Sequence, residues 1–200
     1  IDKLRKSYVF KIVLASTSQA RKNLLERLQI PFQCIAPDID ETSFQNENPG
    51  DLVKRLSKEK AEAVANKVDN ALVIGADTVG VLNNIILCKP LTEESAIQQL
   101  QSMSGKTVTF FTGICVLNTK TNERKIEMET FDVSFRILSN EMIKNYIQKE
   151  HALDCAGSLK VEGFGITLIE TLSGNDYTAL IGLPRIKLTK IVEAMGYPLI

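Results

Sequence analysis

The distribution of apolar residues along the chain predicts both strands and helices. Runs of consecutive or alternating apolar residues are typical of strands, whereas apolar residues three or four positions apart are typical of one helix face. The runs predict strands at 8–15, 71–82, 85–87, 107–117, 125–137 and 165–170, with an extended segment at 32–39. The helical spacing predicts helices at 18–28, 51–67, 92–103 and 139–149, and a last helix opened by residues 182–184.

The order of these elements favours an α/β fold. Strands and helices are mixed without strict alternation, so we expect a mixed sheet with helices on its faces. Residues 71–87 predict a buried hairpin that turns at Asn83 and Asn84. A chain of 200 residues with 44% hydrophobic side chains suits one domain over residues 1–200, or two small lobes that share a sheet. Residues 1–7 are expected to be a flexible lead-in.

Charge and composition argue against several classes of function. The chain has 24 basic and 24 acidic residues, which gives it no general affinity for nucleic acid. No apolar run reaches the roughly 20 residues of a membrane-spanning helix, so no membrane partner is expected. The chain contains four scattered cysteines, Cys34, Cys88, Cys115 and Cys155, and one histidine, His151. This set argues against a zinc site and favours a reduced, cytoplasmic protein. Any metal is then expected to be a hard cation on carboxylates, with Mg²⁺ first.

A candidate anion site lies where the strand at 8–15 meets the helix at 18–28. Ser16 and Ser18 occupy the junction, and Arg21 follows in the first turn of the helix. A helix start offers free N–H groups and the positive end of the helix dipole, and the arginine adds further donors. The alternative is an ordinary capped helix with a solvated arginine.

Two charged residues lie where the pattern predicts core. Asp77 interrupts an apolar strand between Gly75 and Gly80, two glycines that would let backbone or ligand approach closely. Because an unpaired buried carboxylate is costly, Asp77 is paired, bound to metal, or placed at a β-bulge where it bonds its own turn. Lys60 interrupts the apolar stripe of the helix at 51–67, either as a functional cation or as a lysine snorkelling at the edge of the stripe.

Two further charges complete a candidate pocket. Lys89 closes the hairpin before Pro90, and Asp40 and Glu41 are neighbours in a loop, although each of these charges could also be solvated. Neighbouring side chains on an extended chain point oppositely, so only one of the two acids is expected to reach a shared site. A helix-start anion site, three cations and two carboxylates together describe a pocket for a triphosphate with Mg²⁺. P-loop and dinucleotide fingerprints are absent from the sequence.

Seven short motifs appear in a fixed order along the chain. They are LASTSQAR at 14–21, DET at 40–42, RLSKEKA at 55–61, IGADTV at 74–79, KPL at 89–91, CAGSLKVEGFG at 155–165 and IGLP at 181–184. Over about residues 12–195 the chain thereby resembles the Maf family of nucleotide pyrophosphatases, related in fold to the inosine triphosphate pyrophosphatases. The resemblance implies a twisted mixed sheet flanked by helices, with two lobes around a cleft, as in Maf and Ham1 proteins.

The resemblance also implies a reaction and roles for particular residues. The family hydrolyses a nucleoside triphosphate to the monophosphate and pyrophosphate with a divalent cation, Mg²⁺ or Mn²⁺. Asp77 matches the catalytic aspartate, the proton acceptor for the water that attacks the α-phosphorus, and is also a metal ligand together with Glu41. The residues that match the phosphate-binding positions are Ser16, Ser18, Arg21, Lys60 and Lys89.

Three positions bear on the nucleobase. Glu162 matches the branch that resembles 7-methyl-GTP pyrophosphatases, and its carboxylate suits the N–H edge of guanine and the positive charge of the methylated ring. Ala20 departs from that branch, which usually has Trp there, and Thr78 matches the branch that handles dTTP and UTP. The resemblance therefore favours 7-methyl-GTP, with dTTP or UTP as the alternative.

Two other classes of function remain to be weighed. A nucleotide-binding regulator of cell division with little hydrolysis is one, but the presence of Asp77, Glu41, Lys60 and Lys89 favours the enzyme. A DNA-binding module is disfavoured by the zero net charge. Because the resembling family often forms homodimers, the expected partners are a nucleoside triphosphate and a second copy of the chain.

Overall fold

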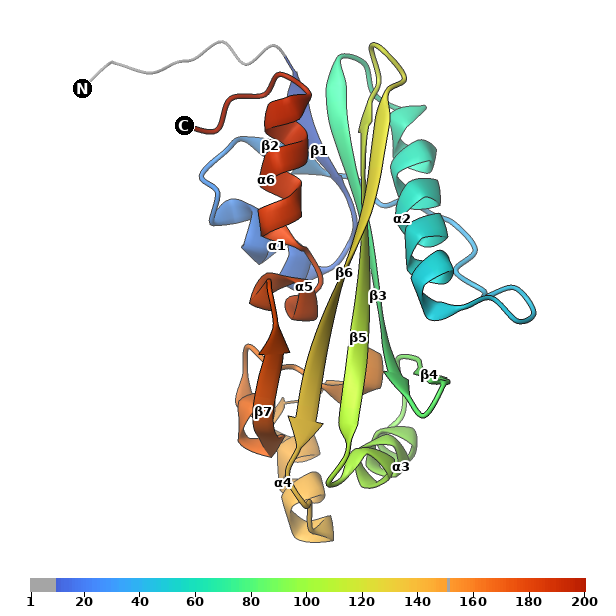
Figure 1. Cartoon of the computed structure of the whole chain (residues 1–200), viewed down its shortest axis with the longest axis vertical. Coiled ribbons are helices and arrows are strands. Elements are labelled where there is room, and N and C mark those ends of the chain that lie inside the picture. The colour runs from blue at the N-terminus through green and yellow to red at the C-terminus, as the bar shows by residue number, and fades with distance from the viewer. Residues whose placement is uncertain (1–9, 151) are drawn as a thin grey trace.

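The computed structural model describes residues 10–150 and 152–200. Within this part of the chain, seven strands form one twisted sheet in the order β2-β1-β3-β5-β6-β7, with β4 paired to β3 (Figure 1). β1 (Lys11–Ala15) is parallel to β2 (Phe32–Cys34) and to β3 (Ala71–Leu82). The other strands are antiparallel to their neighbours: β4 (Ile85–Leu87), β5 (Thr107–Asn118), β6 (Arg124–Phe135) and β7 (Ile169–Gly174). The predicted mixed sheet is confirmed.

The helices divide the molecule into two lobes that share the long strands β3, β5 and β6 (Figure 1). In the upper lobe, α2 (Pro49–Ala65) lies on one side of the sheet, and α1 (Gln19–Glu26) and α6 (Arg185–Ala194) lie on the other. The lower lobe contains α3 (Glu93–Met103) and α4 (Asn140–Glu150). Three short helices complete the fold: η1 (Ala156–Ser158), η2 (Phe164–Leu168) and α5 (Tyr177–Ile181).

Side-chain alternation along β3 explains why both of its faces are covered in the upper lobe. Leu72 and Ile74 belong to the apolar cluster that includes residues of α1 and α6, whereas Val73 belongs to the cluster that includes Ala61 of α2. A separate cluster fills the lower lobe and includes Tyr146 of α4. The middle of β3 therefore lies between the cores of the two lobes, and this is where Asp77 is found.

The prediction of a strand at residues 165–170 is wrong. Residues 164–168 form the 3-10 helix η2, and β7 begins only at Ile169. The backbone turns back here, because the Gly165 N–H donates to the carbonyl of Lys160 at 3.1 Å. A Cβ at Gly165 would lie 2.5 Å from that carbonyl oxygen, so the glycine allows a turn that the apolar pattern alone does not reveal.

The boundaries of the other elements match the pattern to different degrees. β3 and β4 have the predicted bounds, and Thr92 caps α3 as expected. Helix α2 begins earlier than predicted, at Pro49, because Asn48 supplies the cap. The last helix, predicted to open at residues 182–184, is α6, which begins at Arg185 with Pro184 as its N-cap.

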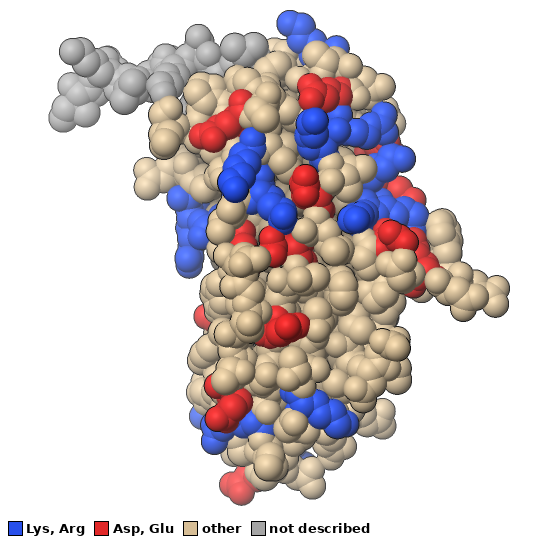
Figure 2. All heavy atoms as spheres, in the orientation of Figure 1, with Lys and Arg blue, Asp and Glu red and all other residues tan. Residues whose placement is uncertain are grey.

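Some expectations fall outside the described residues. These are the lead-in at residues 1–7, the first two residues of the strand predicted at 8–15, and His151. On the face seen in Figure 2, acidic and basic side chains are intermixed over the upper lobe, in keeping with the zero net charge. In the described part of the chain, none of the helices combines the length and apolarity needed to cross a membrane.

Candidate active site

The site is built around a buried ammonium group. Lys60 Nζ on α2 donates to Asp77 Oδ1 on β3 at 2.6 Å and lies 2.9 Å from Glu41 Oε1 of the loop before α2. Lys60 and Asp77 are 4% and 6% exposed, whereas the Glu41 side chain is 48% exposed. Both buried charges are therefore paired, as burial of a charge requires.

This geometry decides between the alternatives that the sequence left open. Lys60 does not snorkel outwards, because its charged end is buried against Asp77. Asp77 does not lie at a bulge, because β3 pairs regularly with β5 there and Asp77 faces Gly113. Of the two neighbouring acids, only Glu41 reaches Lys60, while exposed Asp40 accepts a bond from the N–H of Thr42 at 2.9 Å.

Two glycines bring α2 close enough to the sheet for this pairing. A Cβ at Gly75 would lie 2.1 Å from the carbonyl oxygen of Ser57, and a Cβ at Gly113 would lie 2.2 Å from that of Val53. Only glycine leaves room for the helix backbone at these distances. Gly75 and Asp77 share one face of β3, so the close approach of α2 also delivers Lys60 to Asp77. The prediction that Gly75 permits a close backbone approach is confirmed.

The strand-to-helix junction supplies the second part of the site. Ser18 caps α1 by accepting from the Arg21 N–H at 3.4 Å, and the Ser18 N–H donates to Ser16 Oγ at 3.1 Å. The Arg21 side chain is held in place, since Nε donates to the carbonyl of Gly182 at 2.9 Å and Nη2 to Thr78 Oγ1 at 3.4 Å. The alternative of a solvated arginine is therefore wrong.

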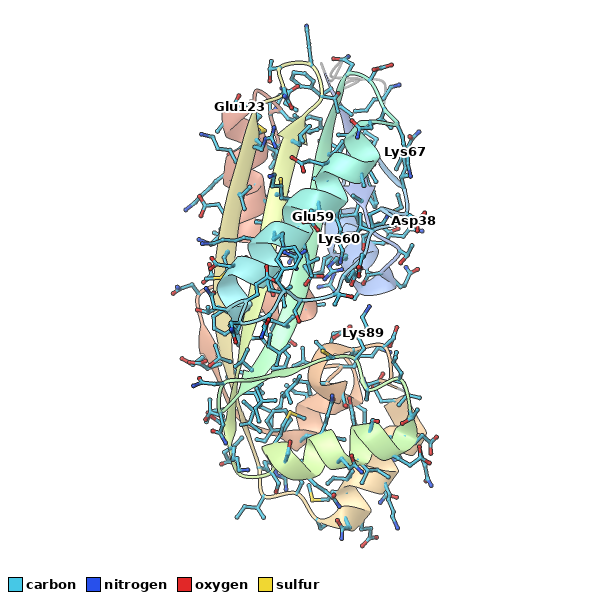
Figure 3. The ribbon with its side chains drawn as sticks, turned by 90° about the vertical axis from the view of Figure 1, so that its right-hand side faces the viewer. Asp38, Glu59, Lys60, Lys67, Lys89 and Glu123 are labelled. Atoms are coloured by element: carbon cyan, nitrogen blue, oxygen red, sulfur yellow. The ribbon has the colours of Figure 1, made fainter. Side chains whose placement is uncertain are left out.

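The charges of Arg21 and Lys89 act on these carboxylates. Burial lowers the pKa of the Arg21 guanidinium, while the charges of Asp77 and Glu41 oppose that shift. Burial raises the pKa of Glu41, but its bond to Lys60 and the charges of Lys60, Lys89 and Arg21 outweigh this effect, and the pKa lies below its ordinary value. Lys89 is exposed on the lower lobe, and in Figure 3 its side chain points toward the upper lobe, where Lys60 lies.

The donor set is of the kind that can hold a hard divalent cation. Among residues 10–150 and 152–200, no group of three or more His, Cys, Asp or Glu side chains could form a metal cage. Mg²⁺ rarely needs such a cage, because it keeps several waters and binds one or two carboxylates together with substrate phosphates. Glu41 and Asp77 bond to the same ammonium and so present two converging carboxylates of this kind.

Comparison with known proteins identifies the family of this chain. The family model described as Maf-like protein matches residues 11–195. The chain belongs to the Maf family. It is 51% identical over 189 residues to a 7-methyl-GTP pyrophosphatase of Nitrosococcus oceani, which covers 94% of this chain and 95% of that relative.

Two solved structures are also similar to this Maf chain. The Ham1 protein of Staphylococcus aureus matches with a TM-score of 0.42 and 20% identity, over 62% of this chain and 71% of that one. A nucleoside-triphosphatase, dITP/XTP pyrophosphatase, of Mycobacterium abscessus matches with a TM-score of 0.42 and 12% identity, over 64% and 76% of the two chains.

The positions that bear on the base lie in different parts of this Maf chain. Thr78 lies on the face of β3 opposite to Asp77 and accepts the bond from Arg21, and Ala20 is half-buried in the first turn of α1. Glu162 is exposed in the turn before η2, near Tyr177. Burial and the charge of Glu162 both raise the pKa of the Tyr177 hydroxyl.

The sequence of this Maf chain did not predict the roles of two residues that hold the site together. Thr112 of β5 donates to the carbonyl of Ala179 at 2.8 Å and lies 3.2 Å from Thr78 Oγ1, so it ties α5 to the sheet. A threonine within an apolar run was the sequence signal that could have revealed it, and in the fold it is 1% exposed. Arg55 of α2 holds the loop that carries Glu41; it opens the motif at 55–61, but its place in the motif did not indicate this role.

Proposed function

We propose that this Maf chain is a nucleoside triphosphate pyrophosphatase that hydrolyses 7-methyl-GTP to the monophosphate and pyrophosphate. The observation that carries the proposal is the convergence of Asp77 and Glu41 on Lys60, at 2.6 and 2.9 Å, beside the cations Arg21 and Lys89. This is the charge pattern needed to bind a polyphosphate and activate a water molecule. The relative named as a 7-methyl-GTP pyrophosphatase, 51% identical over nearly the whole chain, supports both the reaction and the base.

In this proposal the two carboxylates have different roles. Asp77 accepts the proton of the water that attacks the α-phosphorus, and its burial keeps the carboxylate in one orientation against Lys60. Glu41 and Asp77 would together hold a divalent cation, Mg²⁺ or Mn²⁺. When bound, that ion neutralises charge on the phosphate oxygens. Pyrophosphate is the leaving group, and the proton taken by Asp77 passes to solvent.

The cations and the helix start would bind the phosphates. Arg21, Lys60 and Lys89 come from α1, α2 and the segment after β4, so they approach from three directions. Ser16 and Ser18 lie just before α1, where N–H groups and the helix dipole favour an anion. Such preorganised donors stabilise the charge that develops on the leaving pyrophosphate.

In this proposal Glu162 recognises the nucleobase. Its exposed carboxylate can accept bonds from the N–H edge of guanine and attract a positively charged methylated ring. Thr78, which matches the dTTP and UTP branch, accepts a bond from Arg21, and Ala20, which departs from the 7-methyl-GTP branch, lies in the first turn of α1, so both belong to the phosphate-binding part of the proposed site. We therefore assign the choice of base to Glu162.

The test is pyrophosphate release from 7-methyl-GTP, GTP, UTP and dTTP, with Mg²⁺ and with Mn²⁺. We expect 7-methyl-GTP to be hydrolysed fastest and the Asp77→Asn variant to serve as the blank. Faster hydrolysis of UTP or dTTP would instead make Thr78 and Ala20 the determinants. A folded protein that binds these nucleotides without hydrolysing any of them would contradict the enzyme and favour the regulator.

We further propose that the chain acts as one domain over residues 1–200. The sheet that runs through both lobes supports this proposal. A cytoplasmic location, a homodimer, and the absence of nucleic-acid and membrane partners stay predictions from the sequence.

A further inference from the structure

Arg55 connects α2 to the loop that carries Glu41. Its Nε and Nη2 donate to the two carboxylate oxygens of Glu47 at 2.6 and 2.7 Å, and Nη2 also donates to the carbonyl of Thr42 at 3.1 Å. The guanidinium carbon lies 3.9 Å from the centre of the Phe44 ring. On the helix side, Nη1 donates to Glu59 at 3.1 Å, which fixes the guanidinium against its own helix.

The Arg55–Glu47 pair is covered by neighbouring side chains. The side chains of Arg55 and Glu47 are 16% and 8% exposed. A planar guanidinium that bonds both oxygens of a carboxylate fixes direction as well as distance, which a lysine cannot do. The bond to Arg55 is the main reason that the pKa of Glu47 lies below its ordinary value.

The loop depends on such an anchor. Residues 35–48 form neither helix nor strand, so no ladder of backbone hydrogen bonds holds Glu41 in place. Thr42, whose carbonyl Arg55 binds, is the residue directly after Glu41. Arg55 and Lys60 belong to the same helix, so the contacts of Arg55 set where Glu41 lies relative to Lys60.

We propose that Arg55 is a positioning residue that, through Thr42, Phe44 and Glu47, holds the Glu41 carboxylate over Lys60 for binding the divalent cation. This inference rests on the proposed function, in which Glu41 is a cation ligand. Arg55 has no part in the chemistry itself, because its donors are directed at the loop and at Glu59.

The first experiment measures pyrophosphate release against Mg²⁺ concentration for Arg55→Met and Glu47→Gln. Removing a partner that orients a metal ligand typically weakens metal affinity or activity by about 10- to 100-fold. We therefore expect the half-saturating Mg²⁺ concentration to rise by about that factor, with kcat partly recovered at high Mg²⁺. The matched control is Arg124→Met, which removes another arginine that pairs with α2, through Glu62, away from the loop. An unchanged Mg²⁺ dependence in both loop variants would overturn the proposal.

The second experiment separates positioning from a general loss of structure. If Arg55 acts through Glu41, Arg55→Met should not reduce the rate of pyrophosphate release any further when Glu41 is already replaced by Gln. The effects of two coupled residues are not additive. An equal loss in both backgrounds would mean that Arg55 acts independently of Glu41, against the proposal. If Arg55→Met does not fold, the same double-variant comparison is made with Glu47→Gln, which keeps the arginine.

Two measurements do not depend on turnover. Amide hydrogen exchange over residues 40–48 is expected to speed up in Arg55→Met while β3 stays protected. Mn²⁺ binding by electron paramagnetic resonance is expected to weaken by about 10- to 100-fold. If the wild-type protein hydrolyses no nucleotide, the proposed function fails. These two measurements still test whether Arg55 holds the loop that carries Glu41. Unchanged exchange and unchanged Mn²⁺ binding would overturn it.

Discussion

Asp77 and Lys60 are the two buried residues on which the proposed chemistry depends. Asp77→Asn removes the proton acceptor, and we expect kcat to fall by about 10²- to 10⁴-fold, the usual contribution of general base catalysis. The fold should persist, because Lys60 keeps Glu41 as a partner at 2.9 Å. Pyrophosphate release and thermal unfolding check the two parts of this prediction. Asp132→Asn, at an exposed position on β6, is the control, and near-normal turnover in Asp77→Asn would remove Asp77 as the base.

Glu162 is the residue that the proposal links to the base. Hydrogen bonds to a charged group contribute about 1.5–3 kcal/mol, so Glu162→Gln is expected to reduce the preference for 7-methyl-GTP over UTP by about tenfold or more. The ratio of kcat/KM values for the two nucleotides measures this preference. Glu170→Gln, at an exposed position on β7, should leave the ratio unchanged. An unchanged ratio in Glu162→Gln would contradict its assigned role.

The close contact between α2 and β3 sets the position of Lys60, and this contact depends on Gly75. Gly75→Ala would put a Cβ 2.1 Å from the Ser57 carbonyl oxygen, and the helix must move away from the sheet. We expect a loss of at least about 3 kcal/mol in the free energy of unfolding, at the upper end of overpacking effects. Urea unfolding measures it. Gly80→Ala on the same strand meets side chains rather than backbone, the Phe110 ring at 3.2 Å and Val108 Cγ1 at 3.4 Å, and is expected to cost less.

The loop before α2 should become less stable in acid, because its anchor contains a carboxylate. Bonding to Arg55 lowers the pKa of Glu47, although desolvation acts in the opposite direction. A carboxyl group with a lowered pKa in the folded state contributes stability that is full above its unfolded pKa and is lost as the pH falls through the folded pKa. Glu47→Gln should therefore lower the free energy of unfolding at neutral pH, and the difference from wild type should vanish in acid.

Urea unfolding of both proteins at a series of pH values checks this prediction. The control is Glu123→Gln, since the nearest cation to Glu123, Lys125 Nζ, lies 4.0 Å away. A difference between Glu47→Gln and wild type that stays constant down to low pH would mean that the Arg55–Glu47 pair does not stabilise the folded state.

The sequence predicts the long strand β3 and its hairpin partner β4 to the residue, but it misreads or misses two short segments, at 164–168 and 177–181. β3 is predicted to the residue because its twelve residues are nearly all apolar. The five-residue helix α5 was missed, since it is too short to show a helical period and depends on its Asp176 cap. Asp77 and Lys60 could be found because each breaks an apolar pattern. Arg55 could not, because its partners belong to a loop without periodicity.

At the scale of the whole molecule, the site joins two lobes with separate apolar cores. Lys60 and Asp77 belong to the upper lobe, whereas Lys89 is an exposed residue of the lower lobe that points toward them (Figure 3). The lobes are joined by the continuous strands β3, β5 and β6. A bound triphosphate would add a second connection, because its charges attract cations from both lobes.

This connection should be visible as ligand-dependent stability. At 100 times Kd, a ligand stabilises the folded state by about 2.7 kcal/mol. For a chain of this size, that corresponds to a rise of about 5–10 °C in Tm. We expect this shift for the wild-type protein with Mg²⁺ and a guanosine triphosphate analogue that carries an α,β-methylene group and resists cleavage.

Lys89→Met tests the contribution of the lower lobe to this shift. Because Lys89 is exposed, its removal should leave the Tm of the free protein unchanged. If the lysine contributes about tenfold to affinity, the same ligand concentration corresponds to about 10 times Kd, and the shift falls to about half. Lys144→Met, at an exposed position on α4, should keep the full shift. A full shift in Lys89→Met would mean that the upper lobe binds the triphosphate alone.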